Sequence, residues 1–199
     1  MEKTAIIVLA AGGSSRLGRP KQLLPYKGTT LLNHCINELI GIPNTDVWVV
    51  IGAYSEEVKK VLDGETVHAV YNNNWEKGMG SSIAVTLQAL KAYDAYKRVL
   101  ITLGDLPLLT RDHFRQLLKE HKGEDHITLT QYTDIQGVPV IFGKRYYQEL
   151  ENCSGDEGAK AIIKNHQKNI TPVPTKIPFT DIDTEAAYQE LLRSTGGTK

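Results

Sequence analysis

The segment from Leu9 to Lys21 carries the residue types most suited to chemistry in this chain. Its sequence, LAAGGSSRLGRPK, follows the apolar run 5–9 and contains three glycines, two serines and three cations. Glycine lets a backbone approach a ligand closely and point its N–H groups at it. Arginine and lysine favour a ligand with several negative charges. The segment therefore predicts a site for a polyphosphate, and specifically for a nucleoside triphosphate.

Two common phosphate-binding loops do not match this segment. The loop of nucleoside triphosphatases requires Gly, four further residues, Gly, Lys and then Ser or Thr. Gly13 and Gly18 have that spacing, but Arg19 and Pro20 follow them. The dinucleotide fingerprint Gly-x-Gly-x-x-Gly does not fit either, because Gly12 and Gly13 are adjacent. The segment must therefore bind phosphate in another way.

Carboxylates occur at two later places where a metal ion could bind beside a polyphosphate. Asp105 comes just beyond the apolar run 98–103, and Asp181 and Asp183 alternate before Thr184. Ligands of open α/β sheets bind beyond the carboxyl ends of the strands, and Mg²⁺ takes one or two carboxylates together with phosphate oxygens. An extended backbone would put Asp181 and Asp183 on one face. The alternatives are a loop aspartate starting a turn before Pro107, and a helix cap at Asp183 or Thr184.

A polar segment in the middle of the chain is a second candidate for nucleotide binding. Asn73 lies in a run of asparagines before Trp75, and Gly80 and Ser81 lie in the run Gly78–Ser82. Asparagine can pair with the edge of a base, and a helix beginning near Ser81 would direct its amino terminus toward an anion. The alternative is a polar loop in which Ser81 or Ser82 caps that helix.

The glycine-rich segment resembles the Leu-Ala-Ala-Gly-x-Ser-x-Arg-x-Gly-x-x-Lys signature of nucleotidyltransferases, and most closely the molybdenum cofactor cytidylyltransferase group. Every fixed position is filled: Leu9, Ala10, Ala11, Gly12, Ser14, Arg16, Gly18 and Lys21. The later runs Gly137–Phe142 and Gly155–Ala159 resemble the Gly-x-Pro-x-x-Phe and Gly-Asp-x-Gly-Ala motifs of the same group. Val138 stands where molybdopterin enzymes often have histidine.

The resemblance implies transfer of a nucleotidyl group from a nucleoside triphosphate to a phosphorylated acceptor, with release of pyrophosphate. It implies CTP as donor, because the guanylyl group usually has glycine in place of Ala11, and molybdopterin as acceptor, with a molybdoenzyme as partner. The implied site has four parts. The nucleotide would be bound by Leu9, Ala10, Ala11, Gly12, Gly13, Ser14, Ser15, Asn73, Gly80 and Ser81, and both nucleotide binding and catalysis would involve Arg16 and Lys21. Mg²⁺ would be bound by Asp105 and Asp183, with Asp181 as second choice, and the acceptor by Gly137, Pro139, Gly155 and Asp156. Alternatives are a sugar or polyol phosphate as acceptor, and a non-catalytic nucleotide-binding or cofactor-delivery protein.

The elements that must position these residues alternate between strand and helix. Apolar strand-like runs at 5–9, 47–51, 67–71 and 98–103 are separated by helical patterns at 30–40, 55–63, 81–93 and 111–122. Such alternation predicts βαβ units and a three-layer αβα, Rossmann-like, mostly parallel sheet. An antiparallel hairpin at 126–131 and 137–142 comes next, followed by helices at 144–151 and 157–167, a strand at 170–174 and a helix at 184–193. The resemblance implies the nucleotide-diphospho-sugar transferase type of this fold. The length of the chain and the lack of a linker or repeat predict one domain over 1–193 with a flexible tail over 194–199.

Composition narrows the class of protein further. The 199 residues carry 23 basic and 23 acidic side chains, and this balance argues against a nucleic-acid binder. Cys35 and Cys153 lack the spacing of a disulfide framework or a zinc site. No apolar run approaches the roughly 20 residues that span a membrane. These features predict a cytoplasmic protein.

Overall fold

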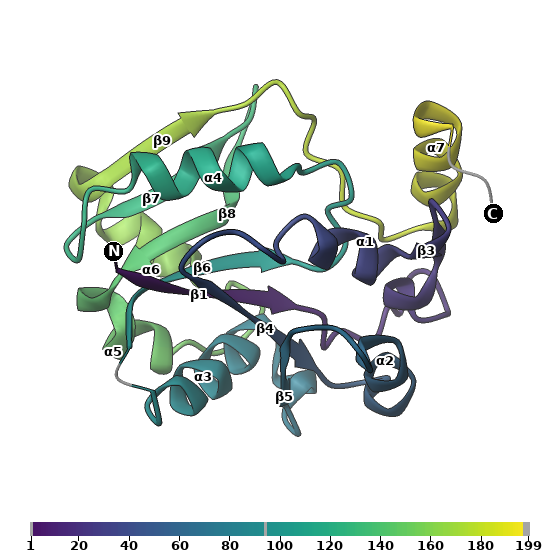
Figure 1. Cartoon of the computed structure of the whole chain (residues 1–199), viewed down its shortest axis with the longest axis horizontal. Helices are drawn as coiled ribbons and strands as arrows, with labels where there is room; N and C mark the ends of the chain where they lie inside the picture. The colour runs from purple at the N-terminus through teal and green to yellow at the C-terminus, as the bar shows by residue number, and fades with distance from the viewer. Residues whose placement is uncertain (1, 94, 197–199) are drawn as a thin grey trace.

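A computed structural model describes residues 2–93 and 95–196, which form a mixed seven-stranded sheet covered by helices on both faces (Figure 1). The strand order is β5-β4-β1-β6-β8-β7-β9. The strands are β1 (Lys3–Leu9), β4 (Thr45–Ile51), β5 (His68–Tyr71), β6 (Tyr96–Leu103), β7 (Ile127–Gln131), β8 (Gln136–Gly143) and β9 (Ile170–Pro174). β8 runs antiparallel to β6 and β7, and the other neighbouring pairs are parallel. The αβα architecture, the mostly parallel sheet and the late antiparallel hairpin are therefore confirmed.

Helices pack on the two faces of the sheet because neighbouring strand residues point to opposite sides. In β1, Ala5 and Ile7 belong to one buried cluster and Ile6 and Val8 to the other. The first cluster is covered by α3 (Met79–Leu90), α5 (Tyr147–Glu151) and α6 (Lys160–Asn165). The second is covered by α1 (Leu31–Asn37), α2 (Ser55–Leu62) and α4 (Arg111–Glu120). Among the described residues, no helix combines the length and apolar character needed to cross a membrane.

A small hairpin next to the glycine-rich segment was not predicted from the sequence. β2 (Pro25–Tyr26) and β3 (Thr29–Thr30) pair through a turn in which both Lys27 and Gly28 have positive φ. Strands of two residues are too short to show an alternating pattern. The hairpin packs against α7 (Glu185–Thr195), and the Tyr188 hydroxyl donates to the Pro25 carbonyl oxygen at 2.6 Å. Figure 1 shows α7 beside β3, far from α5 and α6.

The ends of several helices differ from the predicted ones. α3 begins at Met79 after Gly78, ahead of the predicted start at Ser81, and α6 is shorter than the predicted 157–167 helix. The Thr184 hydroxyl accepts a hydrogen bond from the Ala187 amide, so the capping interpretation of that residue is confirmed. α7 extends to Thr195 and ends at Gly196 in the left-handed conformation, two residues into the predicted flexible tail. Residues 197–199 of that tail lie outside the described part of the chain.

Candidate functional site

The glycine-rich segment lies at the point where the sheet reverses its strand order. β1 is flanked by β4 on one side and β6 on the other, and all three strands are parallel. Beyond β1 the segment continues the pairing, because the Ala10 amide donates to Val50 and the Gly104 amide donates to Leu9. The carboxyl ends of β1 and β6 therefore diverge into the kind of crevice in which α/β proteins bind ligands.

The crevice contains a cavity of about 350 Å³. It is lined by Leu9, Ala10, Ala11, Gly12, Gly13, Lys21, Gln22, Trp75, Glu76, Gly78, Met79, Ser82, Leu103, Gly104, Asp105 and Asp156. A cavity of this size can hold much of a nucleotide-sized ligand. The first half of the glycine-rich segment, residues 9–13, forms one wall of this cavity.

The segment is held in shape by its own polar contacts. Ser14 has φ +51°, its carbonyl oxygen accepts from the Leu17 and Gly18 amides, and its hydroxyl accepts from the Lys21 amide at 3.1 Å. The side-chain amide of buried Gln22 donates to the carbonyl oxygens of Ala10 and Gly12, at 2.8 and 3.0 Å. Gln22 was not among the predicted site residues, since it follows the last fixed position of the signature. These contacts fix the course of the loop backbone, and they do not use the N–H groups of residues 9–13, which form the cavity wall.

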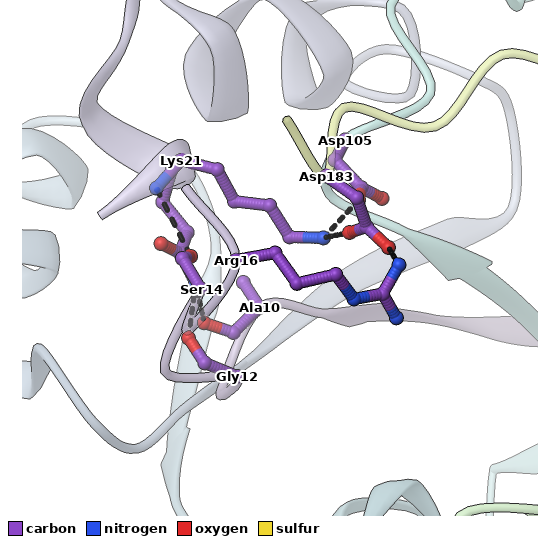
Figure 2. A network of polar contacts seen from close by, with 8 residues as sticks. Ala10, Gly12, Ser14, Arg16, Lys21, Asp105 and Asp183 are labelled. Carbon is purple, nitrogen blue, oxygen red and sulfur yellow. Dashed lines mark hydrogen bonds and ion pairs between the residues drawn. The ribbon is translucent and has the colours of Figure 1, made fainter. Parts of the chain in front are cut away.

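Lys21 joins the loop to the two predicted carboxylates. Its ammonium nitrogen Nζ lies 2.5 Å from Asp105 Oδ2 and 2.7 Å from Asp183 Oδ1. Arg16 Nη1 binds the other oxygen of Asp183, Oδ2, at 2.9 Å. Figure 2 shows both cations reaching from the loop to carboxylates on separate segments. Three stretches far apart in the sequence thus meet within one charged network.

Burial and charge set the protonation of this network. Burial raises the pKa of the Asp105 carboxyl, and the nearby Lys21 ammonium opposes that shift. Burial disfavours the Lys21 ammonium as well, but Asp105 and Asp183 outweigh it and raise the pKa of Lys21. The hydrogen bond from Lys21 lowers the pKa of Asp183. Lys21 is therefore a cation at neutral pH, bound between two acidic side chains.

The donor set fits a divalent cation that shares its coordination with phosphate. Asp105 and Asp183 converge on one point, since both bind the same nitrogen of Lys21. Within the described residues, no group of three or more His, Cys, Asp or Glu side chains is arranged to hold a metal ion. Mg²⁺ typically takes one or two carboxylates and completes its shell with phosphates and water. Asp105 and Asp183 would hold such an ion, whereas Asp181 lines a different cavity.

Close packing around Trp75 explains two of the glycines near the loop. A Cβ atom added to Gly13 would lie 3.1 Å from the Trp75 ring, and one added to Gly52 would lie 2.8 Å from Trp75 Cβ. Trp75 also lines the cavity. The Trp75 indole thus packs against the loop backbone and forms part of the cavity wall, a role that was not predicted from the sequence.

The second candidate segment for nucleotide binding keeps its three predicted residues away from the first cavity. Asn73 is exposed, and neither it nor Gly80 and Ser81 lines the cavity. The buried neighbour Asn72 organises the loop instead, since its side-chain amide donates to the Ser81 and Ser82 hydroxyls, both at 2.9 Å. Ser82, rather than Ser81, reaches the cavity.

The four predicted acceptor residues are divided between two places. Gly137 lines a second cavity of about 540 Å³, and Asp156 lines the first one. The Pro139 carbonyl oxygen accepts from the Thr130 hydroxyl, and the Gly155 carbonyl oxygen accepts from the Gly80 amide at 2.8 Å. Pro139 and Gly155 thus make contacts within the fold, and only Gly137 and Asp156 of the four face a cavity.

Replacing Gly80 by alanine should destabilise the protein by about 1–3 kcal/mol through overpacking. A Cβ atom there would lie 2.5 Å from the Ser154 amide nitrogen, so the backbone of the 154–156 segment would have to move. Chemical denaturation of the variant measures this loss. Gln88→Ala, at an exposed position of the same helix, is the matched control and should stay within about 0.5 kcal/mol of the unmodified protein. Equal stability of both variants would show that the 154–156 segment is not packed tightly on Gly80.

Comparison with known proteins identifies relatives along most of the chain. Nicotine blue oxidoreductase of Paenarthrobacter nicotinovorans is 30% identical over 197 residues, which cover 94% of this chain and 95% of that protein. The bifunctional protein GlmU of Stutzerimonas stutzeri is 33% identical over 174 residues, but the match spans only 37% of its length. These two names denote different activities, so the reaction of this chain has to be argued from its own residues.

Solved structures share the fold. Rv0371c from Mycobacterium tuberculosis H37Rv is 25% identical with a TM-score of 0.83, and the match covers 96% of this chain and 98% of that one. A structure of Rv0371c in complex with manganese gives a TM-score of 0.80. CMP:2-keto-3-deoxy-manno-octonic acid synthetase in complex with CTP is 14% identical over 98% of this chain and 99% of that one, with a TM-score of 0.73 that shows likeness of fold.

The match to a family model covers most of the strands and most of the site. It extends over residues 6–170 and so includes the glycine-rich segment, Lys21 and Asp105, whereas Asp183 lies beyond it. The model is that of the MobA-like NTP transferase domain, and the chain belongs to this family of nucleotidyltransferases.

Proposed function

We propose that this protein transfers a cytidylyl group from CTP to a phosphorylated acceptor, with molybdopterin as the acceptor and Mg²⁺ as the metal. The observation that carries the proposal is the position of Lys21. Its ammonium joins the glycine-rich loop to Asp105 and Asp183 at the switch point of the sheet. A phosphate loop, a buried cation and two converging carboxylates are the parts that phosphoryl chemistry needs, since such reactions depend on positioning and charge neutralisation.

The reaction is an in-line substitution at the α-phosphorus of the nucleotide. A phosphate oxygen of the acceptor forms a bond to that phosphorus, the bond to the bridging oxygen breaks, and pyrophosphate leaves with the electron pair. The backbone of residues 12–15 would bind the triphosphate, and Arg16 would bind its outer phosphates. Lys21 would stabilise the charge that develops at the α-phosphate. Mg²⁺ on Asp105 and Asp183 would supply further neutralisation of phosphate charge.

The choice of CTP and molybdopterin rests on the resemblance in the signature. Ala10-Ala11 matches the cytidylyl group, and the guanylyl group usually has glycine at the second position. Both alanines line the first cavity, where a base edge would meet their backbone. A sugar or polyol phosphate is the competing acceptor, and a nucleotide-binding protein without catalysis is the competing class.

Release of pyrophosphate tests the proposal directly. CTP, GTP, UTP and ATP would each be incubated with molybdopterin or with a hexose phosphate, in the presence of Mg²⁺, Mn²⁺ or a chelator. Release with CTP and molybdopterin that disappears with the chelator is the expected result. Faster release with the hexose phosphate would support the competing acceptor. No release in any combination, with nucleotide binding intact, would make the protein a non-catalytic binder.

The two arginines of the loop provide a matched pair of variants. Arg16→Ala should raise the KM for CTP by about tenfold, because a charge-assisted contact to phosphate would be lost. Arg19→Ala should leave that KM unchanged, since Arg19 pairs with Glu185 at 2.5 Å and not with the carboxylates of the Lys21 network. Initial rates of pyrophosphate release over a range of CTP concentrations measure both values. Equal effects of the two substitutions would contradict the role assigned to Arg16.

A further inference from the structure

The carbonyl groups of the glycine-rich segment are turned toward donors within the protein. Every carbonyl oxygen from Ala10 to Ser14 accepts a hydrogen bond. The donors are Gln22 Nε2 for Ala10 and Gly12, the Ala53 amide for Ala11, the Tyr54 hydroxyl for Gly13, and the Leu17 and Gly18 amides for Ser14. The protein thus holds all the oxygens of this stretch, which would repel a phosphate if they faced it.

The amide groups of the same segment are unused. Within residues 2–93 and 95–196, the N–H groups of residues 11–16 donate to no other group of the protein. The C=O and N–H of one trans peptide unit point in opposite directions, so a carbonyl held by the protein fixes the direction of the next amide. Residues 9–13 line the first cavity. Consecutive unpaired amides on such a segment form a concave site for an anion.

Gln22 makes two of the carbonyl contacts with a single side chain. It is 3% exposed, and its Nε2 donates to the Ala10 and Gly12 oxygens at 2.8 and 3.0 Å, both on one side of the loop (Figure 2). Oε1 is buried and has no partner in the described part of the chain, which costs free energy. The opposite orientation of the amide would place Oε1 against two carbonyl oxygens. The fold thus keeps both donors of Gln22 on the loop at the expense of an unpaired acceptor, as happens where function constrains a residue.

Tyr54 makes the contact to Gly13 from a different part of the chain. It directly precedes α2, and its hydroxyl donates to the Gly13 carbonyl oxygen at 3.3 Å. The side chain packs against the buried cluster beneath α1, α2 and α4, so the sheet and its helices hold the hydroxyl in place. The contact is longer than either contact of Gln22, and we therefore expect it to hold the loop less strongly.

We propose that Gln22 and Tyr54 are positioning residues for the triphosphate: by holding three carbonyl groups of the loop, they direct the amides that follow toward phosphate oxygens. The inference rests on the proposed function and adds two residues that act through the loop backbone. Without the Gln22 amide, the Ala10 and Gly12 carbonyls would lack their donor, and the peptide units could rotate until an oxygen faced the anion. Ligand binding would then have to reverse that rotation, and affinity falls when a site is not preorganised.

Inorganic tripolyphosphate is a suitable probe, because it presents the phosphates of a nucleoside triphosphate without base, ribose or acceptor. Isothermal titration calorimetry in the presence of Mg²⁺ should show saturable binding to the unmodified protein. Gln22→Leu keeps a similar volume but cannot donate, and it should weaken binding about tenfold. Tyr54→Phe removes one hydroxyl and the longer contact alone, and it should weaken binding about threefold.

Two control variants remove comparable contacts elsewhere in the fold. Asn33 Nδ2 donates to the Val61 carbonyl oxygen at 2.7 Å, and its Oδ1 is likewise buried without a partner among the described residues. Asn33→Leu should therefore lower the stability to urea, as Gln22→Leu should, but leave the affinity for tripolyphosphate unchanged. Tyr146→Phe removes a hydroxyl that donates to the Asp125 carbonyl oxygen at 2.9 Å, and it should bind the probe as the unmodified protein does. The lining of the first cavity includes neither Asn33 nor Tyr146.

The kinetics of pyrophosphate release separate positioning from a loss of folded protein. Gln22→Leu should raise the KM for CTP about tenfold and change kcat by less than about threefold, because the loop amides bind the triphosphate both before and during the reaction. A purely structural role of Gln22 would instead lower the apparent kcat through loss of folded protein and leave KM unchanged.

The outcomes for the inference and for the proposed function are distinct. Unchanged affinity for tripolyphosphate in both Gln22→Leu and Tyr54→Phe, or an equal loss in Asn33→Leu, would overturn the positioning role. Absence of pyrophosphate release from the unmodified protein with every nucleotide and acceptor would contradict the proposed function. The weaker binding of tripolyphosphate by the two loop variants would still support the inference in that case, because the probe requires no acceptor.

Discussion

Replacing Lys21 by methionine should lower kcat for pyrophosphate release by about 100- to 1000-fold, the usual effect of removing one preorganised group that stabilises transition-state charge. Methionine keeps most of the apolar stem and removes the ammonium. The KM for CTP should change much less, because Arg16 and the loop backbone remain. Initial rates at saturating CTP measure this effect. A kcat within about threefold of the unmodified value would contradict the catalytic role of Lys21.

The same substitution should also reveal how the charged network is held in the fold. The Lys21 and Asp105 side chains are only 20% and 7% exposed, so removal of the ammonium leaves the Asp105 carboxylate buried and unpaired. Breaking such a pair costs about 3–5 kcal/mol. The loss should depend on pH, because burial raises the pKa of Asp105 above its value in the unfolded chain. A carboxyl with a raised pKa is neutral at low pH and costs stability as the pH rises through that pKa.

Urea denaturation of Lys21→Met in the presence of a chelator, between pH 4 and pH 8, tests this dependence. The difference in free energy of unfolding from the unmodified protein should be small at the acidic end and should grow toward neutral pH. Arg19→Met serves as the control, since Arg19 and its partner Glu185 are both about half exposed and such surface pairs contribute little. A difference that is independent of pH would show that Asp105 is not left as a buried charge.

The central strands of the sheet could be predicted because they are buried on both faces. Val47–Ile51 and Val99–Leu103 are continuous apolar runs, the pattern of strands covered by helices on each side. The strand ends in turn located the start of the glycine-rich loop and Asp105 at one edge of the sheet, because the carboxyl ends of parallel strands share an edge. The fold was therefore predictable from the hydrophobic pattern, and the motif positions indicated that the glycine-rich loop, Asp105 and Asp183 belong to one candidate site.

In loops of uniformly polar residues, the sequence could not show which side chains turn inward. Asn72 and Asn73 are adjacent and chemically identical, yet Asn72 is 2% exposed and holds the Ser81 and Ser82 hydroxyls whereas Asn73 is exposed. Only the path of the backbone after β5 decides which of the two turns inward. Gln22 is a similar case, since its role depends on carbonyl groups of Ala10 and Gly12 that the loop directs toward it.

The position of Asp183 depends on a contact that is remote in the sequence. Ile182 is fully buried with Leu24, Tyr26 and residues of α7, so the hairpin and the last helix together place the neighbouring carboxylate at Lys21. Alternation along an extended segment predicted that Asp181 and Asp183 share a face. Asp183 binds Lys21 and Arg16, whereas Asp181 lines the second cavity, and burial together with the charges of both carboxylates raises the pKa of Asp105.

Replacing Asp105 by asparagine should lower the rate of pyrophosphate release by about 1000-fold and weaken its activation by metal. Asparagine matches the shape of aspartate but lacks the negative charge that attracts a divalent cation, and it leaves Lys21 with Asp183 as its one remaining carboxylate. Rates measured over a range of Mg²⁺ and Mn²⁺ concentrations would show a higher concentration for half-maximal activation. Asp181→Asn should shift that concentration less than Asp105→Asn, because Asp181 lines the second cavity and acts on Asp105 only through its charge. Asp112→Asn at a 91% exposed side chain controls for loss of a surface charge. A larger shift in metal activation for Asp181→Asn than for Asp105→Asn would move the metal ligand to the segment before α7. Retention of normal activation in both variants would remove Asp105 and Asp181 from the metal site.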